Sequence, residues 1–523
     1  MAPNFAAAKT HSHEGARKTA GAPSASVKAY KLDNELSQRA NDRNGAHTTR
    51  VIVTLLPGAE LPKEFKKFAR GGKLDLINGQ VLDLPHGVLK QMAAHPSVFR
   101  VHYDRPSETH NYRTAVTVGA RTIQQSLGYT GAGIGIAVID SGITSWHDDL
   151  TNTTSRLFPY GNQRVTKFVD FVNGRTLPYD DNGHGTHIAG IIAGNGYDSR
   201  GEKSGIAPGA SLISLKVLDA NGQGTISNII AALGWVVANA KTYNIRVVNL
   251  SVGANIHESY WTDPLTLAAK AVTDRGITVV TAAGNMGKNA AGRLQYDGIT
   301  APANAPWVLT VGASSTNGTL TRNDDTLAGF SSLGPTYRDY EAKPDLVAPG
   351  VGTVSLAVPG STFYLTKATA LVDGKPVLGA KSYLALSGTS MAAPVVAGTV
   401  ALMLQANPAL TPNLIKALLQ YTAQSYGETN PLGQYKPYSA MRQGAGFLNA
   451  LGAVRLAKFY ANAKPGDKVP VQKVWSRTIN WGNHRLTHGF IKPTANAWAN
   501  NIVWSSCALT VRKNRSCLPL PEG

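Results

Sequence analysis

Ser390 lies at the predicted start of a helix, a position that can hold a reactive hydroxyl group. Residues 388–390 read Gly-Thr-Ser, a tight turn, and the apolar run 391–404 that follows has helical spacing. The first N–H groups of a helix have no partner within the helix and carry partial positive charge, so they could stabilise an oxyanion beside Ser390. Ser390 is therefore a candidate nucleophile, although a serine here could also serve only as a helix cap.

Three further polar residues lie at the ends of predicted elements. Asp140 follows the apolar run 134–139, which is typical of a buried parallel strand, and open α/β sheets bind ligands at the carboxyl ends of their strands. His184 begins a small-residue helix that extends to about residue 193. Asn285 follows a predicted strand, and its amide could donate a hydrogen bond into a cleft. Taken alone, Asp140 and Asn285 would be ordinary turn residues.

Zinc binding is the alternative for His184 and His187. The helical zinc motif has a Glu beside its first His and the second His four residues further on. Here Gly185 follows His184 and the step is three residues. The sequence therefore predicts no metal ligands at this place.

From about residue 116 onward, short apolar runs alternate with helical segments. Strands are expected at 134–139, 212–218, 246–252, 277–282 and 308–311, and helices at 226–240 and 264–275. This alternation predicts an α/β fold, a doubly wound and mostly parallel sheet with helices on both faces. We expect one large domain over residues 116–458.

The remaining regions are expected to have different structures. Residues 1–47 lack periodicity and are expected to be disordered, whereas 48–104 predict a small α+β unit with strands at 51–56, 79–84 and 98–103 and helices at 62–69 and 87–94. Residues 105–115 predict an exposed linker, open to proteolysis. No function can be assigned to the C-terminal tail 459–523, whose Cys507 and Cys517 could pair or remain free.

Composition bears on the possible partners. The net charge of +19 would allow nucleic-acid binding, but the basic residues are dispersed and no RNA-binding or zinc-finger spacing accompanies them. The absence of about 18 consecutive apolar residues argues against a membrane partner. The first 30 residues contain no apolar core of a secretory signal.

Several blocks of the sequence resemble the subtilisin-like serine peptidases, or subtilases. Three of them contain Asp140, His184 and Ser390 in that order, at residues 138–142, 184–190 and 388–394. The similarity extends through 204–208, 283–285, 330–335 and 343–350, and covers about 115–455. The segment 362–383 looks like an insertion before the nucleophile, near the cleft.

The resemblance implies a role for each site residue. Ser390 would be the nucleophile, His184 the base that takes its proton, and Asp140 the carboxylate that orients the imidazole and stabilises its charged form. Asn285 and the backbone N–H of Ser390 would form the oxyanion hole. His187 would be a second, non-catalytic histidine. Further residues would form the two edges of the peptide-binding cleft and the first specificity pocket: Gly222, Gln223 and Gly224; Ser251, Val252 and Gly253; Ala282, Ala283 and Gly284.

The resemblance also implies a self-processing zymogen. Residues 48–104 would be an inhibitory propeptide, and protein and peptide substrates, secretion and a monomeric state are expected. The chemistry would require no cofactor. A structural calcium ion would bind near 193–203, but the family's usual loop is not recognised there.

Two other functions remain as alternatives. A pseudo-enzyme that only binds peptides would be marked by a lost triad residue or oxyanion donor, and neither is seen. An α/β-hydrolase esterase would require Gly-x-Ser-x-Gly and the order Ser, Asp, His. Here Ala392 occupies the last position of that motif, and Asp140 and His184 precede Ser390.

Overall fold

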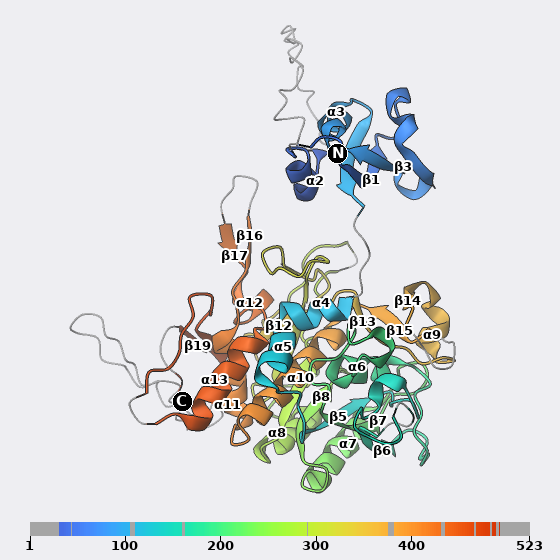
Figure 1. Ribbon diagram of the computed structural model, residues 1–523. Coiled ribbons are helices and arrows are strands. Elements are labelled where there is room, and N and C mark those ends of the chain that lie inside the picture. The colour runs from blue at the N-terminus through green and yellow to red at the C-terminus, as the bar shows by residue number, and fades with distance from the viewer. Residues whose placement is uncertain are drawn as a thin grey trace, which may run out of the picture. The chain divides into compact units, whose positions relative to one another are not determined.

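The computed structural model describes residues 31–491, apart from position 43 and residues 105–109, 159, 161–162, 290, 375–380, 430–434, 465–466, 482–483 and 488–490 (Figure 1). The chain divides into two units, Met1–Ser107 and Glu108–Gly523. Trp498, Trp504, Cys507 and Cys517 lie outside the described residues.

A four-stranded antiparallel sheet in the order β2-β3-β1-β4 forms the N-terminal unit. Every second residue of β1, from Val51 to Leu55, is buried against Phe65 and Met92. The elements are α2 (Asn34–Arg39), β1 (Thr48–Leu55), η2 (Lys63–Phe68), β2 (Ala69–Leu74), η3 (Asp75–Ile77), β3 (Gly79–Pro85), η4 (His86–Val88), α3 (Leu89–Ala94) and β4 (Val98–Tyr103).

The N-terminal unit begins earlier than predicted. Residues 31–47, expected to be disordered, contain helix α2, whose first turn is capped by the Asp33 carboxylate and whose Leu36 is fully buried. The helix expected at 62–69 is the 3-10 helix η2. Strand β2 was not predicted, because its Arg-Gly-Gly-Lys centre lacks alternating apolar residues.

An eight-stranded sheet organises the second unit, Glu108–Gly523, which holds the candidate catalytic residues and is called the catalytic unit below. Its order is β11-β10-β9-β8-β5-β7-β6, with β12 also paired to β10, and every pairing is parallel except that of β11 with β10. The strands are β5 (Gly135–Asp140), β6 (Val165–Asp170), β7 (Ser211–Lys216), β8 (Ile245–Leu250), β9 (Thr278–Ala282), β10 (Leu309–Ser315), β11 (Thr326–Leu327) and β12 (Leu346–Pro349). The predicted α/β fold class is confirmed.

Helices and smaller sheets surround this sheet (Figure 1). The helices are α4 (His110–Thr117), α5 (Ala120–Thr122), η5 (Ile123–Leu127), η6 (Asp148–Leu150), α6 (His184–Ala193), η7 (Tyr197–Ser199), α7 (Ile226–Asn239), α8 (Pro264–Asp274), α9 (Thr362–Thr366), η8 (Ala368–Ala370), α10 (Thr389–Ala406), α11 (Pro412–Thr422), α12 (Ala440–Gln443) and α13 (Ala450–Asn462). The smaller sheets contain β13 (Thr353–Leu356), β14 (Leu371–Val372) and β15 (Tyr383–Leu386); β16 (Gly427–Thr429) and β17 (Tyr435–Pro437); β18 (Thr478–Trp481) and β19 (His484–Thr487).

Alternate residues of β5 face opposite sides of the sheet. Ile136 and Val138 belong to the core that contains α6 and α10, whereas Ala137 and Ile139 belong to the core that contains α7 and α8. Because side chains alternate along a strand, Asp140 at the end of β5 lies on the same face as Ile136 and Val138. The sheet therefore directs Asp140 toward the layer of α6 and α10.

The large domain extends beyond both of its predicted limits, residues 116 and 458. Helix α4 occupies part of the expected linker 105–115, and Ala115 is buried in the core of the catalytic unit. At the other end, Trp475 and Ile479 of the expected tail are buried in the same core. Among the described residues, only α10 has the length and composition of a membrane span, and 83% of it is buried inside the unit, as in a core helix.

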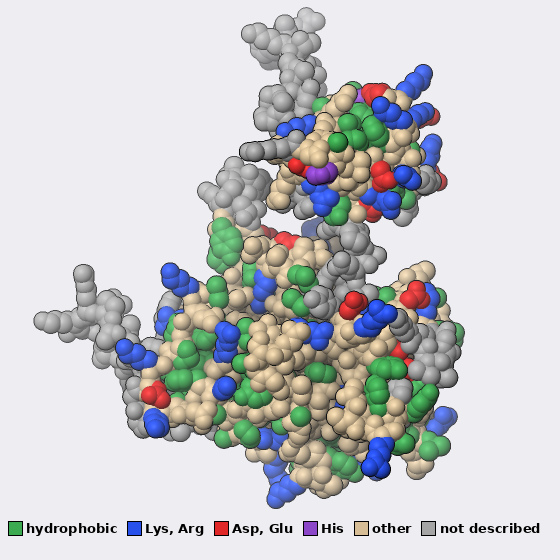
Figure 2. All heavy atoms as spheres, in the orientation of Figure 1, with side chains coloured by type: hydrophobic (Ala, Val, Ile, Leu, Met, Phe, Trp, Pro, Cys, Tyr) green, Lys and Arg blue, Asp and Glu red, His purple; other side chains and the backbone are tan. Residues whose placement is uncertain are grey.

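The basic residues of the catalytic unit do not gather into one patch on the face drawn in Figure 2. Lys and Arg side chains lie singly among uncharged ones over this face. This distribution agrees with the dispersed charges of the sequence.

Candidate active site

Strand β5 holds Asp140 in a fully buried position. The Oδ1 oxygen of Asp140 accepts a hydrogen bond from the Ser141 N–H at 2.7 Å. The backbone oxygen of Asp140 accepts hydrogen bonds from the N–H groups of Val217 and Leu218, which fixes the end of the strand. Asp140 is thus an immobilised carboxylate.

Helix α6 brings His184 against this carboxylate. His184 is the first residue of the helix, and its Nδ1 lies 2.7 Å from Asp140 Oδ1. The chain enters the helix through Gly183, whose φ of 96° favours glycine. A Cβ atom at Gly185 would overlap the carbonyl oxygen of Gly142, so the helix can approach the turn after β5 only with glycine at that position.

Electrostatics favour the charged form of His184. Burial works against the imidazolium, but the negative charge and hydrogen bond of Asp140, with a smaller contribution from Asp180, outweigh it and raise the pKa of His184. The side chain remains 15% exposed, so its outer edge can meet a ligand. This arrangement can accept a proton at Nε2 and stabilise the resulting cation.

Asp180 supports the start of α6, a role that the sequence analysis missed. Its Oδ1 accepts hydrogen bonds from the Ser141 hydroxyl and the Gly183 N–H, both at 2.8 Å. Its Oδ2 accepts from the N–H and hydroxyl of Thr186 at 2.8 and 2.7 Å. Burial raises the pKa of Asp180, although these bonds oppose the shift. A carboxylate four residues before His184 was the available signal.

Ser390 is the second residue of α10. Its hydroxyl donates to the carbonyl oxygen of Ser251 at 3.1 Å, and the Ser251 hydroxyl donates to the Ser390 carbonyl oxygen at 3.1 Å. Within the described residues, the structure therefore joins Asp140 to His184 by a hydrogen bond but does not join His184 to Ser390. Helices α6 and α10 nevertheless contact each other, and Ser390 is only half-buried. A rotation about χ1 is enough to release its hydroxyl from Ser251.

Asn285 is attached to the start of α10. Its Oδ1 accepts hydrogen bonds from the N–H and the hydroxyl of Thr389 at 2.9 and 3.0 Å. The Thr389 hydroxyl in turn accepts from the Gly284 N–H at 3.2 Å. Because these bonds use the amide oxygen, the Nδ2 group of Asn285 is left as a donor beside Gly388. The sequence did not indicate that Thr389 orients this amide.

The residues predicted to form the cleft edges differ in exposure: Gln223, Gly224 and Gly253 are exposed, Gly222 and Val252 are half-buried, and Ser251 is buried. Gly222, Gln223 and Gly224 follow β7 in an exposed turn, and Ser251, Val252 and Gly253 follow β8. In the predicted pocket wall, Ala282 and Ala283 are buried and Gly284 has a φ of 106°. These three segments lie at the carboxyl ends of β7, β8 and β9. In the sheet, β7 and β8 both adjoin β5, and β9 adjoins β8.

Lys216 is a second residue of this region that the sequence analysis did not single out. It is fully buried, and its ammonium group donates to the carbonyl oxygens of Ser141 and Leu218 at 2.7 and 2.8 Å and to Asp181 Oδ1 at 2.7 Å. Lys216 thereby joins the turn after Asp140 to the loop before His184. A lysine within the apolar run 212–218 was its only signal.

The predicted insertion 362–383 lies beside His184. The N–H groups of Thr362 and Phe363 donate to the carbonyl oxygens of Asp181 and Asn182, both at 2.9 Å. The Phe363 ring meets the His184 ring edge to face, with 6.0 Å between centroids. The described part of this segment therefore contributes an apolar wall next to the imidazole.

The described residues after α6 do not fit the calcium site that the resemblance implies. Calcium takes six to eight oxygen ligands. Both oxygens of Asp149 already accept hydrogen bonds, from the Asp198 N–H and the Tyr383 hydroxyl. Burial raises the pKa of Asp198 to about 7, so a proton can neutralise it. The Arg164 guanidinium donates hydrogen bonds to four carbonyl oxygens around this loop, those of Asp149, Thr151, Ala193 and Pro208.

Comparison with known proteins gives consistent matches. A model of the subtilase family matches residues 131–452. The chain is 39% identical to serine protease AprX of Bacillus subtilis (strain 168) over 334 residues, which are 62% of this chain and 67% of that protein. It is 33% identical to subtilisin NAT of Bacillus subtilis subsp. natto over 377 residues, 71% of this chain and 80% of that protein. The crystal structure of a cold adapted subtilisin-like serine proteinase matches with 29% identity and a TM-score of 0.42, covering 59% of this chain and 89% of that one.

Proposed function

The chain belongs to the subtilase family of serine peptidases, and from this premise we propose that Asp140, His184 and Ser390 form its catalytic triad. The protein is a serine endopeptidase. The observation that carries the assignment is the 2.7 Å contact between Asp140 Oδ1 and His184 Nδ1, made on the sheet face that also holds the start of α10. In a triad this contact fixes the imidazole tautomer and leaves Nε2 to take the serine proton.

The proposed reaction proceeds through an acyl-enzyme. The Ser390 hydroxyl leaves the Ser251 carbonyl oxygen, gives its proton to His184 and attacks the scissile carbonyl carbon. His184 then returns the proton to the leaving amine, and water releases the acyl group by the same route. Asn285 Nδ2 and the Ser390 N–H would donate to the oxyanion. All of these groups belong to the chain, so the proposed steps need no cofactor.

Protein substrates would bind in an extended conformation. The exposed residues Gln223, Gly224 and Gly253, at the ends of the strands on either side of β5, support pairing with a peptide as an added strand. Ala282, Ala283 and Gly284 have no charged side chain, which supports a pocket for an apolar substrate residue. Phe363 would extend this apolar surface beside His184.

The N-terminal unit would act as an inhibitory propeptide that the enzyme removes from itself. Its compact sheet and its position before the catalytic unit support this proposal. By analogy with the family, the mature enzyme would be secreted and monomeric.

The triad is tested by substituting its members. Ser390→Ala and His184→Ala should each lower kcat on casein or peptides by about a million-fold, as loss of either group does in subtilisin. A fluorophosphonate should label wild-type Ser390 and should fail to label Ser390→Ala. Ser387→Ala, three residues earlier and exposed, is the matched control and should be labelled like the wild type. Turnover within tenfold of wild type in either triad variant would show that the assignment is wrong.

A further inference from the structure

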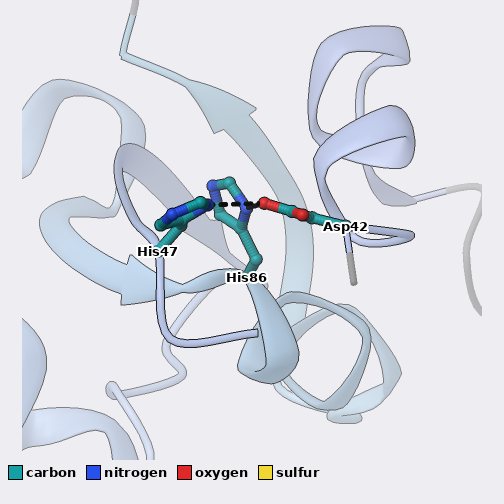
Figure 3. A group of neighbouring side chains, drawn as sticks. All are labelled: Asp42, His47 and His86. Carbon is teal, nitrogen blue, oxygen red and sulfur yellow. Dashed lines mark hydrogen bonds and ion pairs between the residues drawn. The ribbon is translucent and has the colours of Figure 1, made fainter. Parts of the chain in front are cut away.

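A cluster of two histidines and one aspartate lies in the N-terminal unit (Figure 3). Asp42 follows α2, His47 precedes β1, and His86 begins η4 after β3. The Asp42 Oδ2 atom lies 2.8 Å from His47 Nδ1 and 2.9 Å from His86 Nδ1. Both imidazole rings thus present the same kind of nitrogen to one carboxylate oxygen.

Each ring is also held from its other side. His86 Nε2 lies 2.6 Å from the Thr49 hydroxyl, which itself accepts a hydrogen bond from Arg39. His47 Nε2 lies 3.1 Å from Asn44 Nδ2, so the Asn44 amide must turn its oxygen toward the ring when Nδ1 binds a metal and Nε2 carries the proton. Histidines that bind metals commonly donate their other ring N–H to such an outer partner, which holds the ring orientation. The orientation of both rings is therefore set before any ligand arrives.

The cluster has one closed and one open side. The His86 side chain is 9% exposed, whereas Asp42 and His47 are 31% and 61% exposed. Asp42 carries a carboxylate, which is ionised at neutral pH. A cation can therefore reach the three atoms from solvent and meet a negative charge there.

Two imidazole nitrogens and one carboxylate oxygen define the class of ion. Imidazole suits zinc, copper, nickel and cobalt, whereas calcium and magnesium prefer oxygen ligands. Zinc bonds of about 2.0 Å in tetrahedral geometry place ligand atoms about 3.3 Å apart. The two contacts of 2.8 and 2.9 Å would have to open by about 0.5 Å, and the exposure of Asp42 and His47 leaves room for that shift.

We propose that Asp42, His47 and His86 bind one zinc-class divalent ion, with water as the fourth ligand. The ion would replace the two ring hydrogen bonds to Asp42 and join the segment after α2 to the end of β3. Because an ion that binds only the folded unit stabilises it, bound zinc would raise the resistance of this unit to unfolding. A slower loss of inhibition would follow only if the N-terminal unit is the propeptide; metal binding itself does not depend on that function.

The test uses the full chain without an affinity tag and with Ser390→Ala, so that it stays uncut. His11 and His13 could bind metal unspecifically, so both are changed to Gln throughout. After removal of metals with a chelator, zinc binding is measured by calorimetry, and cobalt is added to record the visible absorption of a four-coordinate site. We expect one ion per chain, with that absorption, and a higher melting temperature of the N-terminal unit.

Five variants decide the outcome. Changing a residue that only orients a ligand typically costs 10–100-fold in affinity, so Thr49→Ala should lose about that much and His47→Gln or His86→Gln at least about 100-fold. The exposed His47 keeps the test valid if His86→Gln fails to fold. His95 lies in the same unit and is hydrogen-bonded to Ser97. His95→Gln is the matched control and should bind zinc like the parent chain. Absence of zinc binding, or binding that His47→Gln leaves unchanged, would overturn the proposal. His147, Asp149 and Asp198 form the other such group among the described residues, so binding that is lost only in Asp198→Asn would also overturn the proposal.

Discussion

Asn285 is held in a single orientation by Thr389. The two hydrogen bonds to Oδ1 leave Nδ2 to donate, and Asn285→Ala removes this donor where charge develops only in the transition state. We expect kcat to fall by about 100 to 1,000-fold with little change in KM, the loss that removal of one oxyanion donor causes in subtilisin. Steady-state kinetics on a peptide anilide measures both parameters.

Asn285→Asp is the control for that prediction. An aspartate keeps the acceptor for Thr389 but has no N–H group, so it should lose at least as much kcat as alanine. If Asn285→Ala raised KM and left kcat unchanged, the residue would bind substrate and would not stabilise the oxyanion.

The pH dependence of the enzyme follows from the surroundings of His184. The neutral imidazole is the base, so activity rises with pH through the pKa of His184, which Asp140 and Asp180 raise above its ordinary 6.5. The acid limb of kcat/KM should therefore have its midpoint above 6.5. Asp180→Asn removes one of the negative charges, so its limb should move to lower pH.

An exposed carboxylate serves as the control for the pH experiment. Asp274, at the end of α8, lies in an ion pair with Lys270. Asp274→Asn should leave the pH midpoint of the acid limb unchanged. If Asp180→Asn left the pH midpoint of the acid limb unchanged or raised it, Asp180 would not act on His184 through its charge.

The individual site residues could be predicted from the sequence to different degrees. Asp140, His184, Asn285 and Ser390 stand in short motifs with a clear chemical meaning, so the sequence alone indicates them. Asp180, Lys216 and Phe363 act by contacts across the fold. Phe363, for example, is 179 positions from His184 in the sequence but meets its ring. No local pattern records such a pairing.

At the scale of elements, the start of α6 depends on glycine. Gly185→Ala places a Cβ onto the Gly142 carbonyl oxygen, so the helix must move away from the turn that follows Asp140. We expect a loss of at least about 2 kcal/mol in stability from this overpacking and a fall in kcat, because the Asp140–His184 contact lengthens. Thermal unfolding and kinetics measure the two effects.

A glycine in another helix provides the matched substitution. Gly234 lies inside α7, and a Cβ there would meet nothing within 4 Å. Gly234→Ala should therefore stabilise the protein by about 0.5–1 kcal/mol, the ordinary helical preference for alanine. Equal effects of the two substitutions would mean that contact with Gly142 does not constrain α6.

The sequence predicted best the strands and helices that correspond to buried apolar runs. Strands β5, β7, β8, β9 and β10 were each predicted within a few residues, and so were α7 and α8. Strand β6 was not predicted, because it lies at the sheet edge and its exposed Thr166 and Lys167 interrupt the apolar run. Edge strands are half solvated, so their composition is less distinctive.

For the whole molecule, the order of the units could be predicted but their limits could not. Periodicity identified the small unit and the large one. It could not show that Leu36 belongs to the core of the first unit, or that Trp475 belongs to the core of the second. Single buried residues beyond a regular element carry no repeating signal.

The order of the two units along the chain leads to a prediction of self-processing. Strand β4 ends at Tyr103, helix α4 begins at His110, and Ala115 is buried in the catalytic unit. We therefore narrow the expected cleavage to between about Asp104 and His110, because a cut further on would require unfolding α4. Cutting there would turn an inhibitor held at high effective concentration into a separate domain that can dissociate.

Mass spectrometry of purified chains tests this processing. The wild type should yield a mature form that begins between about Asp104 and His110, whereas Ser390→Ala should accumulate uncut. The rate of conversion should not depend on protein concentration, because the cleft and the bond belong to one chain. A trace of mature enzyme should still cut Ser390→Ala in the same segment, since the sequence around the bond is unchanged. A fully active wild type whose N-terminus remains upstream of Val51 would refute the propeptide assignment and leave the triad untouched.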